Sequence, residues 1–346
     1  MKTMSEKGAL SHPKGADTLD AARLLDHGGR LVVGVDGSEG SMAALRWAVS
    51  EAQLRGAAVH MVMAWRHPQS YWPATVWTMM MDSSGDTRQT MANAANTELE
   101  RLGMEARQGQ NAEITWEAME GHPAEVLVRA AEGAGALVVG SRGSGGFVGV
   151  LLGSVSQHVV VHASCPVILI PAPAGESVPA GTVPPAHAHE PFGRIVVRVD
   201  GSDGSRAALA WAVNEAQLRG ASVHAVIAWE RITGPGATNG WAVGTGGPSG
   251  DTDPVMATAT VEVTRLAKES VKGSDVTISC EAIEGHPAQV LVQCAEGAAA
   301  LVVGSRGHGG FVGALLGSVS QHVVAHARCP VVLIPDPVHP RHTRPQ

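Results

Sequence analysis

The sequence predicts an α/β protein made of two tandem domains, each an open, parallel, five-stranded sheet flanked by helices. The first observation is an internal duplication: LVVGVDGSEGS and IVVRVDGSDGS place Asp36 and Asp200 at equivalent positions, 164 residues apart. The second is that short apolar runs alternate with longer segments bounded by helix caps within each copy. Such alternation is typical of a parallel sheet with helices on both faces.

The elements of the first copy follow in a regular order. Ser38 or Ser41 can cap the first helix and Gly56 can end it, because a hydroxyl accepts from first-turn N–H groups and glycine adopts the left-handed conformation. Pro123 is favoured in the first turn of a helix. Two further helices are expected at 90–104 and about 154–162. Short apolar runs predict buried strands at 31–35, 58–65, 112–119, 136–140 and 166–170.

Segments outside the two copies differ in composition. We expect a flexible N-terminal arm over residues 1–29, a Pro/Ala/Gly-rich linker over 172–193 and a short tail over 336–346. The two domains then cover 30–171 and 194–335. The offset of 164 residues is constant from Asp36 to the last strand, so the duplication involves one whole domain and no short solenoid repeat.

Composition excludes several classes of function. Of 346 residues, 44% are hydrophobic and 16% are charged, which is ordinary for globular domains. A net charge of −7 gives no basic field for nucleic acid. No apolar run reaches the roughly 20 residues that span a bilayer, and the N-terminal residues lack the apolar centre of a signal peptide. We therefore expect a cytoplasmic protein that binds neither nucleic acid nor membrane.

Four cysteines are present, and none forms a C-x-x-C pair or a zinc-ligand spacing with histidine. Cys165 and Cys329 each precede a proline and an apolar strand, which indicates buried packing positions. We expect structural thiols and no protein-held metal.

A glycine-rich segment follows the fourth expected strand in each copy, with the spacing G-x2-G-x9-G-S. It leaves the carboxyl end of a strand and ends at the start of a helix, where backbone N–H groups and the helix dipole favour an anion. Glycines allow close approach, so the segment predicts a phosphate cradle. A Walker A loop is excluded because no lysine lies between Lys14 and Lys268, and the dinucleotide fingerprint would follow the first strand.

Asp36 and Asp200 stand just past the first strand of each copy, in VDGS. If the first and fourth strands are neighbours, each carboxylate faces the glycine segment across the crevice where ligands of open sheets bind. A carboxylate there suits a sugar hydroxyl or a magnesium ion shared with phosphate. The alternative is that it only supports the Asp-Gly turn. Arg142 and Arg306 could likewise pair with phosphate or be solvated loop arginines.

This set of motifs, followed by VSQHVVVHASCPVILIP, resembles the universal stress protein family, and more narrowly a tandem form of its ATP-binding subclass. The resemblance covers about 30–171 and 194–335. It implies Rossmann-like sheets of the adenine nucleotide alpha hydrolase type. It also implies an intrachain pseudo-dimer joined edge to edge through the last strands, PVILI and PVVLI, and one ATP site per domain.

The resemblance also implies roles for individual residues. Phosphates and ribose would contact Gly140, Gly143, Gly153, Ser154 and the backbone at Val155. Asp36 would lie near the ribose or base, and the backbone near Met63 and Ala64 would meet adenine. The corresponding residues of the second copy are Gly304, Gly307, Gly317, Ser318, Val319, Asp200, Ile227 and Ala228.

No catalytic constellation is recognisable in the sequence, so we expect a nucleotide-dependent stress or dormancy regulator that acts on an unknown protein partner. Two alternatives are an ATP-independent interaction scaffold of the same fold and a slow ATPase. A homodimer is compatible with the sequence. The region 66–90, with two tryptophans and three consecutive methionines, is read either as a lid or partner surface or as a self-packed loop.

Overall fold

A computed structural model describes residues 29–66, 87–142, 152–171, 193–230, 254–270, 274–305 and 316–336. Most of the predicted arm, linker and tail, and most of the 66–90 region, lie outside these residues. Gly143, Arg306 and Gly307 also lie outside them.

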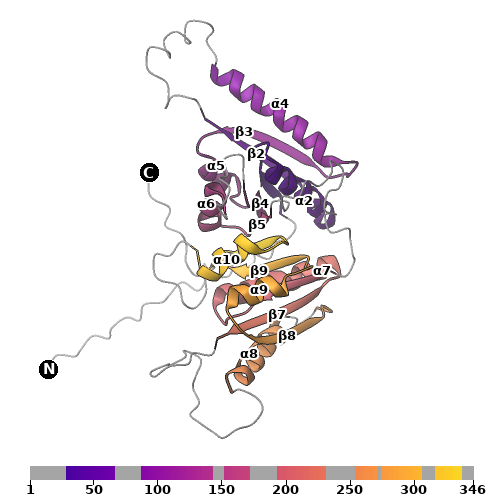
Figure 1. The fold of residues 1–346 in the computed structure, drawn as a ribbon. Helices are drawn as coiled ribbons and strands as arrows, with labels where there is room; N and C mark the ends of the chain where they lie inside the picture. The colour runs from indigo at the N-terminus through magenta and orange to yellow at the C-terminus, as the bar shows by residue number, and fades with distance from the viewer. Residues whose placement is uncertain are drawn as a thin grey trace, which may run out of the picture.

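The described chain forms one ten-stranded sheet whose strand order is β3-β2-β1-β4-β5-β10-β9-β6-β7-β8 (Figure 1). The strands of the first copy are β1 (Leu31–Gly34), β2 (Val59–Trp65), β3 (Ile114–Glu120), β4 (Ala136–Gly140) and β5 (Val167–Ile170). Those of the second copy are β6 (Arg194–Arg198), β7 (Ser222–Trp229), β8 (Ile278–Glu284), β9 (Ala300–Gly304) and β10 (Val331–Ile334). Within each copy all pairings are parallel, as the alternating pattern predicted.

The two halves join through their last strands. β10 pairs antiparallel with β5, with Val331 opposite Leu169 and Leu333 opposite Val167. Both strands are fully buried and apolar, so the edge that each half would expose alone is covered by the other. The predicted intrachain pseudo-dimer is therefore confirmed, and its two five-stranded sheets are continuous.

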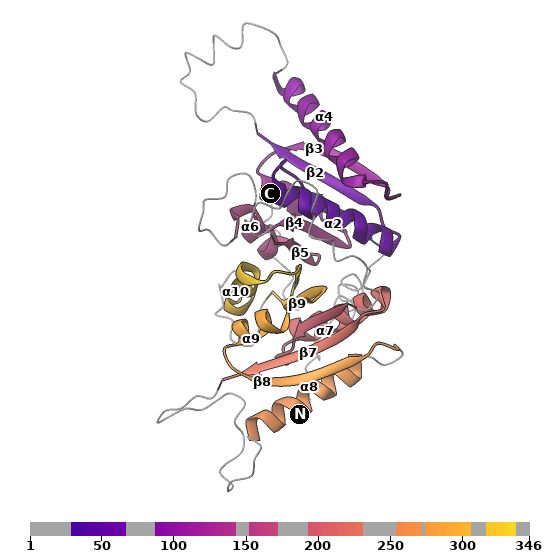
Figure 2. The same ribbon diagram turned by 45° about the vertical axis from the view of Figure 1, so that its right-hand side comes forward.

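Helices cover both faces of this sheet (Figures 1 and 2). One apolar core lies beneath α2, α4, α7 and α8, and a second lies beneath α5, α6, α9 and α10. The bounds of the helices are α2 (Glu39–Arg55), α4 (Thr87–Arg107), α5 (Pro123–Ala130), α6 (Ser154–His162), α7 (Asp203–Arg219), α8 (Pro254–Ser270), α9 (Pro287–Cys294) and α10 (Ser318–His326). None of the helices in the described part of the chain is long and apolar enough to span a membrane.

The ends of the first helix confirm the predicted caps. The Oγ of Ser38 accepts from the backbone N–H of Ser41 at 3.2 Å, so Ser38 is the cap of the two candidates. Gly56 ends α2 with φ 64°, and its N–H donates to the Ala52 carbonyl. Both ends of α2 are thus fixed by local chemistry.

Helix α4 is longer than the predicted segment 90–104 by three residues at each end, because it runs from Thr87 to Arg107. A Cβ on Gly103 would lie 3.1 Å from the Cε of Met61 on β2. The glycine therefore serves close packing of α4 on the sheet and does not end the helix. The strand bounds of the first copy differ from the predicted ones by at most two residues, and those of 136–140 coincide.

A buried ring of charges joins the two halves where α2 meets α7. Arg55 donates to Glu51 at 2.5 Å and to Glu215 at 2.8 Å, and Arg219 donates to Glu215 at 2.5 Å and also to Glu51. The side chains of Arg55 and Glu215 are each 1% exposed. The guanidinium of Arg55 also lies 5.7 Å from the ring of Trp211. Each carboxylate is held by one arginine from each half.

Candidate nucleotide site

The candidate site lies at the carboxyl ends of β1 and β4, which are adjacent parallel strands with Val33 beside Val138. From β1 the chain continues outward to β2, whereas β5 lies on the other side of β4. The strand order therefore reverses between β1 and β4, which is where open α/β sheets bind ligands. The second half repeats the arrangement at β6 and β9, with Val197 beside Val302.

We call the region at the carboxyl ends of β1 and β4 the first crevice, and that of β6 and β9 the second crevice. Closely packed backbone forms the base of the first crevice. A Cβ on Gly40, in the first turn of α2, would lie 2.5 Å from the carbonyl oxygen of Arg142. A Cβ on Gly140 would lie 2.7 Å from the carbonyl carbon of Gly40. Both positions require glycine, because any side chain would separate the start of α2 from the end of β4. The role of Gly40 was not predicted, although GS-x-GS recurs in both copies.

Helix α6 begins at the end of this crevice in a fixed position. The Gly153 N–H donates to the Ser141 carbonyl at 3.0 Å, and the Ser156 hydroxyl donates to the Gly140 carbonyl at 2.9 Å. Gly153 is the N-cap residue and supplies no side-chain acceptor. Since the first intrahelical bond is Gln157 N–H to Gly153 carbonyl, the N–H groups of Ser154 and Val155 have no partner within the helix.

The second crevice repeats these contacts. Gly317 N–H donates to the Ser305 carbonyl at 3.1 Å, and the Ser320 hydroxyl donates to the Gly304 carbonyl at 2.9 Å. Gly317 again caps its helix without a side-chain acceptor, and Ser318 and Val319 supply the N–H groups of the first turn. The same open helix start is therefore present in both halves. By contrast, Ser38 and Ser202 cap the neighbouring helices α2 and α7.

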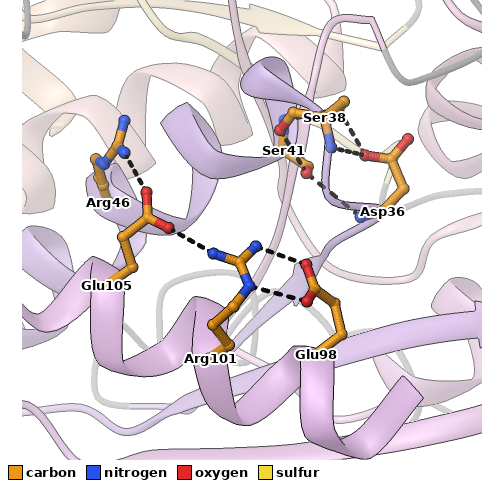
Figure 3. Close-up of polar contacts among 7 residues, drawn as sticks. All are labelled: Asp36, Ser38, Ser41, Arg46, Glu98, Arg101 and Glu105. Atoms are coloured by element: carbon orange, nitrogen blue, oxygen red, sulfur yellow. Dashed lines mark hydrogen bonds and ion pairs between the residues drawn. The ribbon is translucent and has the colours of Figure 1, made fainter. Parts of the chain in front are cut away.

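Asp36 lies at the mouth of the first crevice and is exposed (Figure 3). Its Oδ1 accepts from the Ser38 backbone N–H at 3.0 Å and from the Ser38 hydroxyl at 2.5 Å, and its own N–H donates to Ser41 at 3.3 Å. Asp36 therefore supports the turn, as the structural alternative stated. Its exposure at the crevice also leaves it accessible to a ligand.

Asp200 holds the same turn in the second half, with Oδ1 accepting from the Ser202 N–H at 3.1 Å and from the Ser202 hydroxyl at 2.6 Å. Its Oδ2 also forms an ion pair with Arg198 at 2.8 Å. Burial acts to raise the pKa of Asp200, but the Arg198 charge and the hydrogen bonds from Ser202 and Ser205 outweigh it and hold the pKa below its usual value. The second carboxylate is thus more enclosed than the first.

The backbone at the end of β2 extends past the end of β1. The Val35 N–H donates to the Val62 carbonyl at 3.0 Å, and the Gly121 N–H donates to the Trp65 carbonyl at 3.0 Å on the opposite side. Because successive strand residues direct their polar groups to opposite sides, Ala64 directs its N–H and carbonyl toward the crevice and Met63 directs its own toward β3.

The second half shows the same arrangement, because the Val199 N–H donates to the Val226 carbonyl at 2.9 Å. By the same alternation Ala228 faces the second crevice and Ile227 faces β8. The structure therefore assembles most of the candidate residues at each crevice. Arg142 is exposed at the end of β4 and contributes its carbonyl to the contact with Gly40. The described residues include no group of three or more His, Cys, Asp or Glu that could hold a metal ion.

A charged row on α4 lies beside the first crevice and was not predicted (Figure 3). Arg101 donates to Glu98 at 2.6 Å and to Glu105 at 3.0 Å, and Arg46 of α2 donates to Glu105 at 2.9 Å. The hydrogen bond from Arg101 lowers the pKa of Glu98. The second half repeats the row on α8, where Arg265 donates to Glu262 at 2.5 Å and to Glu269 at 2.8 Å. The i, i+3 and i+4 spacing within the repeat was the available signal.

Comparisons with known proteins agree with the fold and the repeat. The model of the universal stress protein family matches residues 29–171 and again 191–335. Universal stress protein Mb2028c of Mycobacterium bovis is 33% identical over 311 residues, which cover 88% of this chain and 96% of that protein. Universal stress protein Rv1996 of Mycobacterium tuberculosis is 32% identical over 334 residues, covering 90% and 96%.

Among solved structures, a universal stress protein from Archaeoglobus fulgidus aligns with a TM-score of 0.59 at 20% identity, covering 89% of this chain and 97% of that chain. This likeness concerns the fold. The two family matches and the relatives above 30% identity make the assignment: the chain belongs to the universal stress protein family and carries two copies of its domain.

Proposed function

We propose that the protein binds one adenine nucleotide, ATP, in each half, and that occupancy sets its behaviour as a stress or dormancy regulator in the cytoplasm. The observation that carries the proposal is the uncapped start of α6, which faces the crevice at the reversal of strand order and recurs at α10. A helix start without a side-chain acceptor offers N–H groups and a positive dipole end to a phosphate.

The residues at each crevice fit such a ligand in a consistent order. Phosphate oxygens would accept from the N–H groups of Ser154 and Val155 and from the Ser154 hydroxyl, with Gly153 leaving room for close approach. Asp36 would accept from a sugar hydroxyl or share a magnesium ion with the phosphates. The N–H and carbonyl of Ala64 would pair with the donor and acceptor edge of adenine.

The second half offers the equivalent groups on its own elements. These are Asp200, Ala228, Gly317, Ser318 and Val319. Binding would add a charged ligand at the start of a helix and the ends of two strands in each half, and the continuous sheet joins the two halves. Such a ligand would alter the surface that a protein partner meets, which is the basis for a regulatory role.

A charge test separates phosphate binding from changes in folding. Ser154 and Ser318 are exposed first-turn residues, so Ser154→Glu and Ser318→Glu place carboxylates where the helix dipole favours them and the fold should persist. A carboxylate about 4 Å from a phosphate raises the free energy of binding by about 1 to 4 kcal/mol. Calorimetric titration with ATP and magnesium should therefore show binding weakened at least roughly fivefold.

The matched controls are Ser154→Gln and Ser318→Gln, which have the same size and no charge. They should bind ATP considerably more tightly than the glutamate variants. If the wild-type chain binds no ATP, the scaffold interpretation replaces the proposal. If bound ATP turns over rapidly, and turnover is lost on Asp36→Ala with Asp200→Ala, the ATPase interpretation replaces the regulatory one.

A further inference from the structure

The two crevices differ at the last residue of their first strand, where β1 has Gly34 and β6 has Arg198. Val196 packs in the core beneath α9 and α10, so Arg198, two residues further along the strand, lies on the same face. Its guanidinium reaches Asp200 at 2.8 Å, and the two side chains are only 18% and 14% exposed. A largely enclosed cation therefore stands in the second crevice.

The first crevice carries no side chain at the equivalent position. A Cβ on Gly34 would lie 2.7 Å from the Cδ1 of Leu127 and 3.2 Å from the Cγ1 of Val139. These two apolar side chains pack against the glycine, and no charged group stands there among the described residues. The arginine is thus a feature of the second half alone, on a framework that otherwise repeats.

The ion pair changes what a ligand must do to use Asp200. Oδ1 already accepts from Ser202, and Oδ2 is buried in the ion pair with Arg198, although it has no hydrogen-bond partner among the described residues. A sugar hydroxyl that displaces Arg198 leaves a poorly hydrated guanidinium without an anion, which is unfavourable. A phosphate gives the guanidinium a new anion, and arginine binds phosphate oxygens strongly.

We propose that Arg198 is a specificity-determining residue that makes the second site select phosphorylated nucleotides over nucleosides, whereas the first site, with Gly34, discriminates less. This inference rests on the proposed nucleotide sites. Arg198 exchanges Asp200 for a ligand phosphate on binding, and Asp200 then accepts from the sugar.

The experiment uses full-length chains in which ATP binding at one site is weakened by charge repulsion. Ser154→Glu leaves the second site as the tighter ATP site, and Ser318→Glu leaves the first; because adenosine has no phosphate, its titrations are fitted with two sites. Each chain is titrated calorimetrically with magnesium ATP and with adenosine, and the ratio of the adenosine Kd to the ATP Kd is compared. We expect a larger ratio in the second-site chain. Adding Arg198→Met to that chain should lower the ratio by roughly tenfold, the effect of one charge-assisted hydrogen bond.

The matched control is Arg194→Met in the same chain, since Arg194 is an exposed arginine at the other end of β6 that donates to the Cys294 carbonyl at 2.9 Å. It should leave the ratio unchanged. The inference is overturned if Arg198→Met leaves the ratio unchanged, if Arg194→Met lowers it equally, or if the second-site chain binds neither ligand while the first-site chain binds ATP. If neither chain nor the wild type binds ATP, the proposed function itself fails.

Discussion

Removing Arg55 should destabilise the protein strongly, because Arg55 neutralises two buried carboxylates from different halves, Glu51 and Glu215. In Arg55→Ala, Arg219 alone remains to balance both. Breaking a buried ion pair by removing one partner typically costs about 3 to 5 kcal/mol. With a urea dependence of about 3 kcal/mol per molar, the unfolding midpoint should fall by about 1 to 2 M, measured by circular dichroism.

The matched control is Arg101→Ala. Arg101 also contacts two carboxylates, Glu98 and Glu105, but its side chain is 55% exposed and exposed ion pairs contribute little to stability. Its unfolding midpoint should stay close to that of the wild type. If Arg55→Ala lowers the midpoint no more than Arg101→Ala does, the buried ring does not contribute to stability in the way described.

Two further substitutions test the packing of the crevice and the charge ring. Gly140→Ala should destabilise the first half and weaken ATP binding, because its Cβ would lie within 2.8 Å of the Gly40 backbone. Gly153→Ala, with nearest atoms at 3.7 Å, should melt close to the wild type; equal melting temperatures for both variants would contradict this reasoning. Burial, and then Glu215, raise the pKa of Glu51 to about 7 from 4.5. The bound proton therefore stabilises the fold fully below pH 4.5, and this contribution is lost as the pH rises through 7. Glu51→Gln should flatten the pH dependence of unfolding in that window, and an unchanged slope would show that Glu51 does not carry it.

Much of the fold could be predicted from sequence because its signals are local. Apolar runs such as ALVVG at 136–140 are too short for helices, and Ser38 and Gly56 carry cap chemistry within one turn of the ends that they fix. The constant offset then transferred every element to the second half. The pairing of β5 with β10 came from the family resemblance, since an apolar strand does not specify its neighbour.

The features that sequence reasoning missed depend on contacts between distant residues. The close packing of Gly103 depends on Met61, which lies on another element. The ring of Glu51, Arg55 and their counterparts forms only when two halves meet. Arg198 was visible as a change from glycine, but its meaning came from its distance to Asp200.

The central claim is that both crevices hold an adenine nucleotide, and the most direct measurement is the nucleotide content of protein purified without added nucleotide. The protein is denatured, and the released compounds are identified by chromatography and counted per chain. We expect about two adenine nucleotides per chain, and fewer in the Ser154→Glu, Ser318→Glu variant while its circular dichroism is unchanged. A chain that releases no nucleotide, and that binds no added ATP by calorimetry, would contradict it.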